Sequence, residues 1–217
     1  ALDTPEEKKQ FKKEVQDLTE RKSINFTNVG IGSGGKGKPR FYSPSNISVS
    51  YAYSEVSHRD ISTSYNNTYN YNGSVNYVFN NQPKPVEPFR NVKFLKKPYM
   101  RILGDFNFYY APSQIAYRTG MDRKYNETLL RNLNNPDQTY VATCDKYFDW
   151  DRQFDLKYSF SKGLKFEWSV NTTALIEEPE GLINKDNKSD YEDYRDDVWR
   201  SIRAFGVAQD HNQKFNA

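Results

Sequence analysis

Residues 148–176 read FDWDRQFDLKYSFSKGLKFEWSVNTTALI, and this stretch decides the fold. Apolar and polar side chains alternate along it with a period of two, which is typical of β-strands whose two faces meet different surroundings. The loop Ser161-Lys162-Gly163 keeps the register, because it pairs Phe160 with Leu164 on one face and puts Gly163 where a left-handed residue is favoured. The stretch therefore predicts an antiparallel hairpin.

The predicted hairpin has one aromatic face and one charged face. Five residues of the aromatic face are predicted to contact lipid or to lie on the outside of a closed sheet: Tyr158, Phe160, Phe166, Trp168 and Val170. Six residues of the opposite face are predicted to line water: Asp149, Asp151, Asp155, Lys157, Lys165 and Glu167. Such a pattern is typical of a membrane β-barrel. A soluble β-sandwich with one solvated face gives the same pattern, so periodicity alone leaves both folds open.

Arg152 falls on the aromatic face and restricts the membrane interpretation. A guanidinium on the lipid face of a barrel costs about 2–4 kcal/mol at the bilayer midplane and close to nothing near the interface. We therefore expect Arg152 to lie at or beyond a membrane boundary, where it can reach water or a loop carboxylate.

The same alternation extends towards the N-terminus. Ile24 and Phe26 are predicted to begin the first strand. Four further sets are each predicted to share one strand face: Ile47, Val49, Tyr51 and Tyr53; Tyr65, Tyr69 and Tyr71; Val75, Tyr77 and Phe79, which follow Asn72-Gly73; and Ile102, Phe106, Phe108 and Tyr110. Residues 82–88 contain three prolines and are predicted to form a stiff connector, not a strand.

Three segments are predicted to be helical. The first covers residues 4–22, where Thr4 can cap the helix, Pro5 suits its first position and Glu7 completes a capping box. The second runs from Arg123 to Leu133. The third covers residues 189–205 and ends at Gly206, and its apolar stripe consists of Tyr191, Tyr194, Val198, Ile202 and Phe205. These helices are too polar to face hydrocarbon, so we expect them in loops outside a bilayer.

Composition excludes several classes of protein. The formal net charge of the 217 residues is only +3 and no concentrated basic face is visible, so the sequence does not indicate nucleic-acid binding. No apolar run approaches the 18 or so residues of a membrane-spanning helix, although this does not bear on barrel strands. Aromatic residues make up 16% of the chain, and they suit the pleated surface of strands.

No motif of the sequence predicts catalysis or a bound cofactor. The loop Gly30–Gly37 imitates phosphate-binding motifs, but Pro39 follows where a helix should open, which favours a flexible loop. Asp149 and Asp151 lie about 7 Å apart on one strand face, a spacing that any solvated strand gives. His58, His211 and Cys144 have no metal-ligand spacing. We predict a non-enzymatic chain without metal or cofactor.

Several segments, in order along the chain, resemble the SprA/Sov family, the outer-membrane translocon of type IX secretion in Bacteroidetes. Residues 21–29 (RKSINFTNV) resemble an R-x-x-N-F-x-N-V segment of that family. The hairpin that starts at FDWDR (148–152) and ends in EPEG (178–181) resembles its strand pair and D-E-P-x-G turn, with Glu177 in place of the aspartate. The helix from Val198 to Gly206 and the strand start at Phe215-Asn216-Ala217 are also similar. Family members are many times longer, so we expect an internal fragment whose export signal lies elsewhere.

The resemblance implies a very large single-chain outer-membrane β-barrel of antiparallel up-and-down strands, with a wide pore and a lateral opening. Its partners would be secreted cargo proteins, including gliding adhesins, together with a barrel partner or lipoprotein, a periplasmic plug and the lipid bilayer. No catalytic residues carry over. We divide the chain into residues 1–22 (helix and linker), 23–181 (barrel segment) and 182–217 (loop helix and start of the next strand). The alternative is a secreted soluble β-sandwich that binds glycan or protein through exposed aromatic residues.

Overall fold

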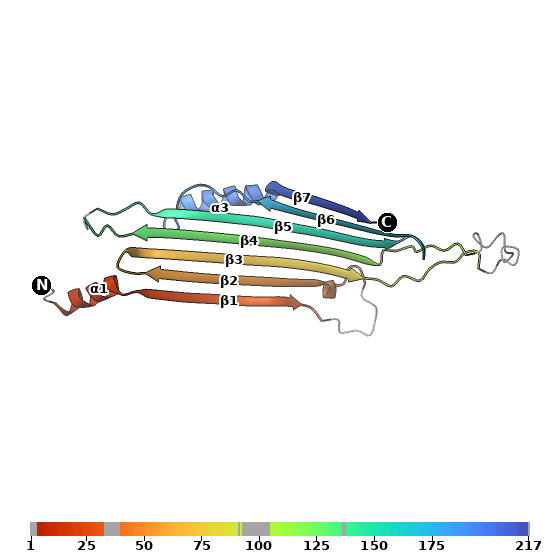
Figure 1. Ribbon diagram of the computed structural model, residues 1–217, viewed down its shortest axis with the longest axis horizontal. Coiled ribbons are helices and arrows are strands. Elements are labelled where there is room, and N and C mark those ends of the chain that lie inside the picture. Colours follow the sequence, from red (N-terminus) through yellow and green to blue (C-terminus); the bar gives the residue numbers. More distant parts are fainter. Residues whose placement is uncertain (1–3, 33–39, 91, 93–104, 136–137, 217) are drawn as a thin grey trace.

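The computed structural model describes residues 4–32, 40–90, 92, 105–135 and 138–216. Its strands form one seven-stranded antiparallel sheet in which each strand pairs with the next along the chain (Figure 1). The mainly β, up-and-down fold predicted from the alternation is therefore confirmed. The strands are β1 (Leu18–Gly30), β2 (Ile47–Arg59), β3 (Thr63–Asn80), β4 (Gln114–Leu130), β5 (Thr143–Ser159), β6 (Lys165–Leu175) and β7 (Val207–Asn216).

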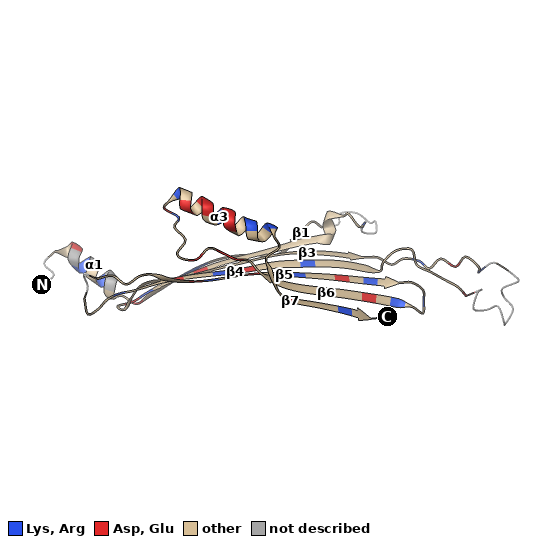
Figure 2. Cartoon of the chain, turned by 90° about the horizontal axis from the view of Figure 1, so that it is seen from above, with Lys and Arg blue, Asp and Glu red and all other residues tan. Residues whose placement is uncertain are grey.

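The sheet is a single open layer, with β1 and β7 at its two edges. Figure 2 shows this layer nearly edge-on, with one helix standing off it and no second sheet among the described residues. The accessible surface is 16025 Å², half as large again as the roughly 10,400 Å² expected for a compact monomer of this mass. The described part of the chain thus has neither the closed sheet of a barrel nor the two packed layers of a sandwich.

The β5–β6 hairpin has the predicted register. Tyr158 pairs with Phe166 and Ser159 with Lys165, and the Phe160 N–H donates to the Leu164 carbonyl over 2.9 Å. The expectation of a left-handed Gly163 is wrong, because only Gly181 and Gly206 have positive φ among the described glycines. The Ser161 hydroxyl oxygen accepts the N–H groups of Gly163 and Leu164, and this side-chain bond closes the turn.

The helix predicted from Arg123 to Leu133 is wrong. Residues 123–130 belong to β4, which pairs with β3 on one side and with β5 on the other along almost its whole length, and residues 131–133 follow its end. The leucines at 129, 130 and 133 suit a short helix locally. Two long ladders of backbone hydrogen bonds override such a weak preference.

The N-terminal helix is shorter than predicted. Helix α1 covers Pro5–Val15, and the Lys8 N–H donates to the Thr4 carbonyl over 3.2 Å, as expected if Thr4 caps the helix. The Glu7 side chain lies outside the described part. The strand starts at Leu18, because residues 18–22 pair with β2 and Lys22 forms an ion pair with Glu55 at 3.3 Å. A bulge between Phe26 and Val29 interrupts this pairing.

The third predicted helix is confirmed as α3 (Lys188–Arg203), between β6 and β7. Asn187 caps its start by accepting the Ser189 N–H, and Gly206 follows its end, as predicted. Phe205 has a φ of 64° and Gly206 one of 67°. The Gly206 N–H donates to the Ser201 carbonyl and the Phe205 N–H to the Ile202 carbonyl, each over 3.0 Å, which is a Schellman termination. It turns the chain directly into β7.

The described residues between β3 and β4 (81–90, 92 and 105–113) extend beyond the end of the sheet and contain no named strand (Figure 1). The connector predicted at 82–88 is confirmed. The strand predicted from Ile102 to Tyr110 is wrong over its described part, where Phe108 forms only an isolated bridge with Val86; Ile102 itself lies outside the described residues. Most of the glycine-rich loop, residues 33–39, also lies outside them.

Candidate functional site: the two faces of the sheet

Strand pairing sorts the side chains of all seven strands onto two unlike faces, because directly opposed residues of antiparallel strands point to the same side. Phe154 lies opposite Tyr117 and Val170, and Tyr117 lies opposite Tyr77. We call this side the aromatic face. Gln153 lies opposite Arg118 and Asn171 on the other side, which we call the polar face.

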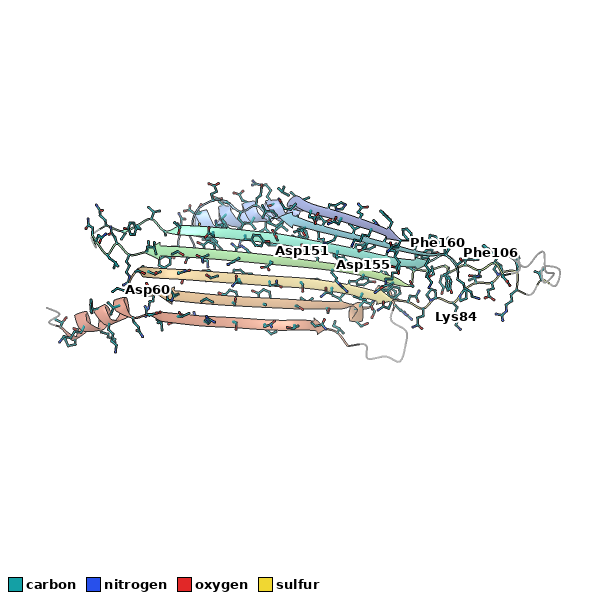
Figure 3. The ribbon with its side chains drawn as sticks, in the orientation of Figure 1. Asp60, Lys84, Phe106, Asp151, Asp155 and Phe160 are labelled. Atoms are coloured by element: carbon teal, nitrogen blue, oxygen red, sulfur yellow. The ribbon has the colours of Figure 1, made fainter. Side chains whose placement is uncertain are left out.

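The predicted site residues divide between these faces as expected. The aromatic face carries Tyr158, Phe160, Phe166, Trp168 and Val170, with ring centroids 4.6 Å apart for Tyr158–Phe160 and 6.3 Å apart for Phe160–Phe166. The polar face carries Asp149, Asp151, Asp155, Lys157, Lys165 and Glu167. Phe160, Asp151 and Asp155 are labelled in Figure 3. The division of residues is thus established, and the medium at each face is a separate question.

Hydrogen bonds tie the polar face together across the strands. The Ser169 hydroxyl donates to Asp155 over 2.6 Å, and Lys157 lies 3.6 Å from Glu167. Further from this hairpin, the Asn126 amide donates to Thr68 over 3.0 Å. Small and polar side chains prevail on this face, as expected for a surface in contact with water.

The aromatic face has an uncovered half, which we call the open part. It is made of Ile47, Val49, Val75, Ile115, Tyr117, Phe154, Leu156, Tyr158, Phe160, Phe166, Trp168, Val170 and Phe215. Trp168 stacks on Phe215 at 6.1 Å, yet Phe215 is 61% exposed. At one edge of this surface, Phe41 packs over the neighbouring Tyr77 and Phe79, with ring centroids 5.8 and 5.7 Å away. At the end of β5, the Tyr158 hydroxyl donates to the Tyr109 carbonyl over 2.7 Å. A contiguous apolar surface of this kind marks contact with another apolar body.

The other half of the aromatic face is covered by residues 176–206, and we call it the covered part. It comprises Tyr69, Tyr71, Arg123, Tyr125, Lys146 and Phe148. Residues 178–194 contact this set, and α3 stands over this side of the sheet in Figure 2. Tyr125 is only 4% exposed and Phe148 7%. Ile176, which opens the covering segment, is 2% exposed. Most of the small described core is therefore in this half.

An ionic cluster holds the cover to the sheet. Glu178, whose side chain is 3% exposed, receives both the Nε–H and an Nη2–H of Arg123, the latter over 2.9 Å. Arg123 also donates to the Tyr194 hydroxyl of α3 over 2.7 Å, and Tyr194 in turn donates to Glu178. Burial, together with the bond to Glu178, raises the pKa of Tyr194. Each charge in this cluster has a partner from another element.

Lys146 adds a second link to the cover. Its ammonium donates to the Pro179 carbonyl over 2.6 Å and lies 4.9 Å from the centre of the Tyr194 ring. The Tyr125 hydroxyl accepts the Ile183 N–H over 3.3 Å. Residues 176–206 thus supply hydrogen-bond partners for Arg123, Lys146 and Tyr125 on this half of the aromatic face.

Arg152 lies where the open and covered parts meet. Its guanidinium is 4.6 Å from the centre of the Trp150 ring and 5.4 Å from that of Phe205, and it donates to the Phe205 carbonyl over 3.3 Å. Trp150 and Phe205 stack at 5.8 Å. The expected loop partner of Arg152 is therefore a backbone carbonyl and not a carboxylate.

Sequence reasoning missed the cluster of Arg123, Glu178 and Tyr194. Placing Arg123 in a helix concealed that it occupies the aromatic face of a strand. The signal was present in the alternation: with β4 read as a strand, Arg123 and Tyr125 fall on the side of Tyr117, and a buried arginine demands a carboxylate from elsewhere.

The residues weighed for catalysis and metal binding are not brought together. His58 lies in β2, Cys144 in β5 and His211 in β7, and Asp149 and Asp151 bond to neighbouring Tyr147 and Thr173 hydroxyls. The described residues contain no group of three or more His, Cys, Asp or Glu that could hold a metal ion. None of the described helices has the length and apolarity needed to cross a membrane.

No protein-family model matches the sequence, and no curated protein matches it.

Proposed function

We propose that this chain is a wall segment of a large outer-membrane β-barrel that conducts exported proteins. The observation that carries the proposal is the open part of the aromatic face, an uncovered apolar surface backed across a single layer by a hydrogen-bonded polar face. A sheet one layer thick with these two faces suits a boundary between hydrocarbon and water.

The dimensions of the apolar band are close to those of a bilayer. From Arg152, at its border, to Phe160 the chain rises about 26 Å at about 3.3 Å per residue. At the strand tilt of about 40° that is usual in barrels, this length corresponds to a height of about 20 Å, against about 25 Å for the usual apolar band. Arg152 then lies at one border of the band, where a charged side chain costs little.

The two sheet edges support a larger assembly. β1 and β7 each present one unpaired row of backbone N–H and C=O groups. In hydrocarbon such groups must be paired, which is why spanning sheets close on themselves. The proposal therefore requires further strands beside β1 and β7. It also places α1, α3 and the described residues between β3 and β4 outside the bilayer.

The resemblance to the SprA/Sov family supplies the finer proposal. Under this finer proposal, the polar face lines the aqueous passage of a type IX translocon. The charged residues that line it are Asp149, Asp151, Asp155, Lys157, Lys165 and Glu167. Folded cargo, including gliding adhesins, passes through with the help of a barrel partner and a periplasmic plug. The role is conduction and not catalysis. The soluble β-sandwich alternative has less support, because the described strands form one layer.

The first test is the partition of the chain between water and lipid. We expect it to float with phospholipid vesicles and to resist extraction by alkaline carbonate. A chain that stays in the aqueous fraction as a monodisperse monomer without detergent would overturn the barrel proposal and favour the soluble alternative.

The second test addresses protein conduction. Depletion of the protein in the bacterium that produces it should trap signal-bearing cargo in the periplasm, while unrelated outer-membrane proteins stay at normal levels. Normal export on depletion would contradict the translocon role even if the chain proved to be a membrane protein.

A further inference from the structure

Arg152 belongs to a polar row that crosses the aromatic face at the border of the open part. Arg152 lies opposite Thr119 of β4 and Thr172 of β6, and Thr172 lies opposite His211 of β7. The Thr172 hydroxyl bonds to His211 Nδ1 over 2.7 Å, and the Thr119 hydroxyl accepts the Trp150 indole N–H over 2.6 Å. Arg152 is the cationic member of this row, and several of its N–H donors have no partner among the described residues.

The guanidinium of Arg152 is only partly used by the protein. It has five N–H donors. Within the described part of the chain, one bond of 3.3 Å goes to the Phe205 carbonyl and the buried Nε–H has no acceptor. Contacts with the rings of Trp150 and Phe205 fix the plane of the group without using its donors. A ligand with several oxygen acceptors would satisfy them.

A hollow of about 310 Å³ opens beside this guanidinium. Its lining consists of Tyr117, Arg152, Gln153, Phe154, Val170 and Thr172, and no carboxylate is among them. The nearest acidic side chains of β5, Asp151 and Asp155, point to the polar face. The site thus combines one cation with aromatic and aliphatic walls, and it would attract an anion attached to an apolar group.

We propose that Arg152 binds the phosphate of a membrane lipid headgroup at the border of the apolar band. Two parallel N–H···O bonds from a guanidinium match the geometry of phosphate oxygens. The apolar walls of the hollow face the side on which the acyl chains and glycerol of such a lipid would lie. This inference rests on the proposed membrane position of the open part, and it adds a lipid site that fixes the depth of β5.

The test compares two lipids with brominated acyl chains, phosphatidylglycerol and the uncharged, phosphate-free digalactosyldiacylglycerol. Each is titrated into the folded chain in mixed micelles while tryptophan quenching is followed; Trp150 and Trp168 report on this face. We expect phosphatidylglycerol to reach half-quenching at a concentration about tenfold lower than the galactolipid, as a bidentate charged contact predicts.

Three variants sharpen the comparison. Arg152→Gln should abolish the preference for the phosphate lipid, and Arg152→Lys should keep part of it, because an ammonium binds phosphate without the fork geometry. Arg118→Gln is the matched control: Arg118 is exposed one position along on the polar face, opposite Gln153, and its loss should leave the preference intact.

Other outcomes would overturn the inference. A preference that disappears when millimolar inorganic phosphate is added would identify a site for free anions and not for lipid. A variant Arg152→Gln that keeps the preference but exposes the Phe205 and Gly206 amides to hydrogen exchange would show that Arg152 only anchors α3. Equal quenching by both lipids would refute the lipid-phosphate site alone, whereas no quenching by either would refute the proposed function and this inference with it.

Discussion

The open and covered parts of the aromatic face lie on the same strands and point to the same side, yet they differ in chemistry. The open part is made of hydrocarbon and tyrosine side chains. The covered part contains Arg123 and Lys146, and each is satisfied by residues 176–206. Polar groups thus occur on this face where the chain supplies their partners. The open part carries no charged side chain and suits a medium that offers a charge no partner.

The difference between the two parts also indicates where, under the proposed function, the strands leave the bilayer. β4 and β5 continue beyond the apolar band without a change of period, but their aromatic-face residues there include Arg123 and Lys146 and carry a cover. We infer that the change of side-chain chemistry along a strand marks the membrane border, and that Arg152 stands at it.

The largest expected effect comes from a charge in the middle of the open part. Leu156→Arg should destabilise the chain in a bilayer by about 4 kcal/mol, because a midplane guanidinium costs up to about that much. Asn171→Arg, at an exposed position on the polar face of β6, is the control and should cost less than about 1 kcal/mol. Urea unfolding from vesicles measures both, and equal losses would contradict the assignment of the faces.

The next effect concerns the cover. Glu178→Ala leaves Arg123 without its carboxylate in a setting where the arginine side chain is 20% exposed, and we expect a loss of about 3 kcal/mol. Hydrogen exchange should rise across residues 183–206 and stay unchanged in the β5–β6 hairpin.

Two variants check the interpretation of that result. Glu177→Ala removes the adjacent exposed carboxylate and should be close to neutral. The double variant Arg123→Met with Glu178→Met removes both charges and should recover much of the loss, since apolar pairs often replace buried ion pairs without cost. If it is as unstable as Glu178→Ala alone, the unpaired charge is not the cause.

A smaller effect is expected at two glycines, Gly206 at the end of the covering segment and Gly163 in the β5–β6 turn beside the open part. At Gly206 a Cβ would lie 2.6 Å from the Leu175 carbonyl oxygen, and φ is +67°, so Gly206→Ala should cost about 2 kcal/mol. At Gly163, in the turn of the open half, nothing lies within 4 Å of a Cβ and φ is not positive. Gly163→Ala should therefore be neutral or stabilising by up to about 1 kcal/mol. Thermal unfolding of the two variants in the same detergent makes the comparison, and a reversed order would contradict both assignments.

The smallest effect is a pH dependence at the β2–β3 turn, beyond the covered half. Hydrogen bonds from Ser62, and from the Thr63 N–H at 2.6 Å, lower the pKa of Asp60 to about 2. Since the ordinary aspartate pKa is about 3.9, the stabilisation is complete above that value and is lost as the pH falls towards 2. Carboxyl chemical shifts should titrate with a midpoint near 2, and Asp60→Asn should remove this response. A midpoint near 4 would show that the turn is open in solution.

The alternation along the sequence was sufficient to predict the strand faces and the register of the β5–β6 hairpin. These depend on neighbouring residues, so local pattern contains the information. The prediction of a helix at Arg123–Leu133 was wrong because it rested on three leucines. The strand β4 forms there because it pairs with β3, which lies far away in the sequence. The prediction of a left-handed Gly163 was wrong because a hydrogen bond to the Ser161 hydroxyl closes the turn instead.

The ionic cluster under the cover was not predictable in the same way. Arg123, Glu178 and Tyr194 come from a strand, a loop and a helix, and the bonds between them span 55 and 71 residues. Only the strand face of Arg123 could have been derived from the sequence. The identity of its partner depends on how the 176–206 segment folds back on the sheet, which no local pattern specifies.

The most direct test of the central claim is a nitroxide scan along β5 in vesicles, from position 146 to position 160, in a chain whose sole cysteine is replaced by Cys144→Ser. Collision rates with oxygen, which concentrates in hydrocarbon, and with a water-soluble nickel complex should alternate with opposite phase. Positions 154, 156, 158 and 160 should favour oxygen, their odd neighbours nickel, and positions 146 and 148 should be shielded from both. Shielding of positions 154–160 from both reagents, or equal access of nickel to the two faces, would contradict the account.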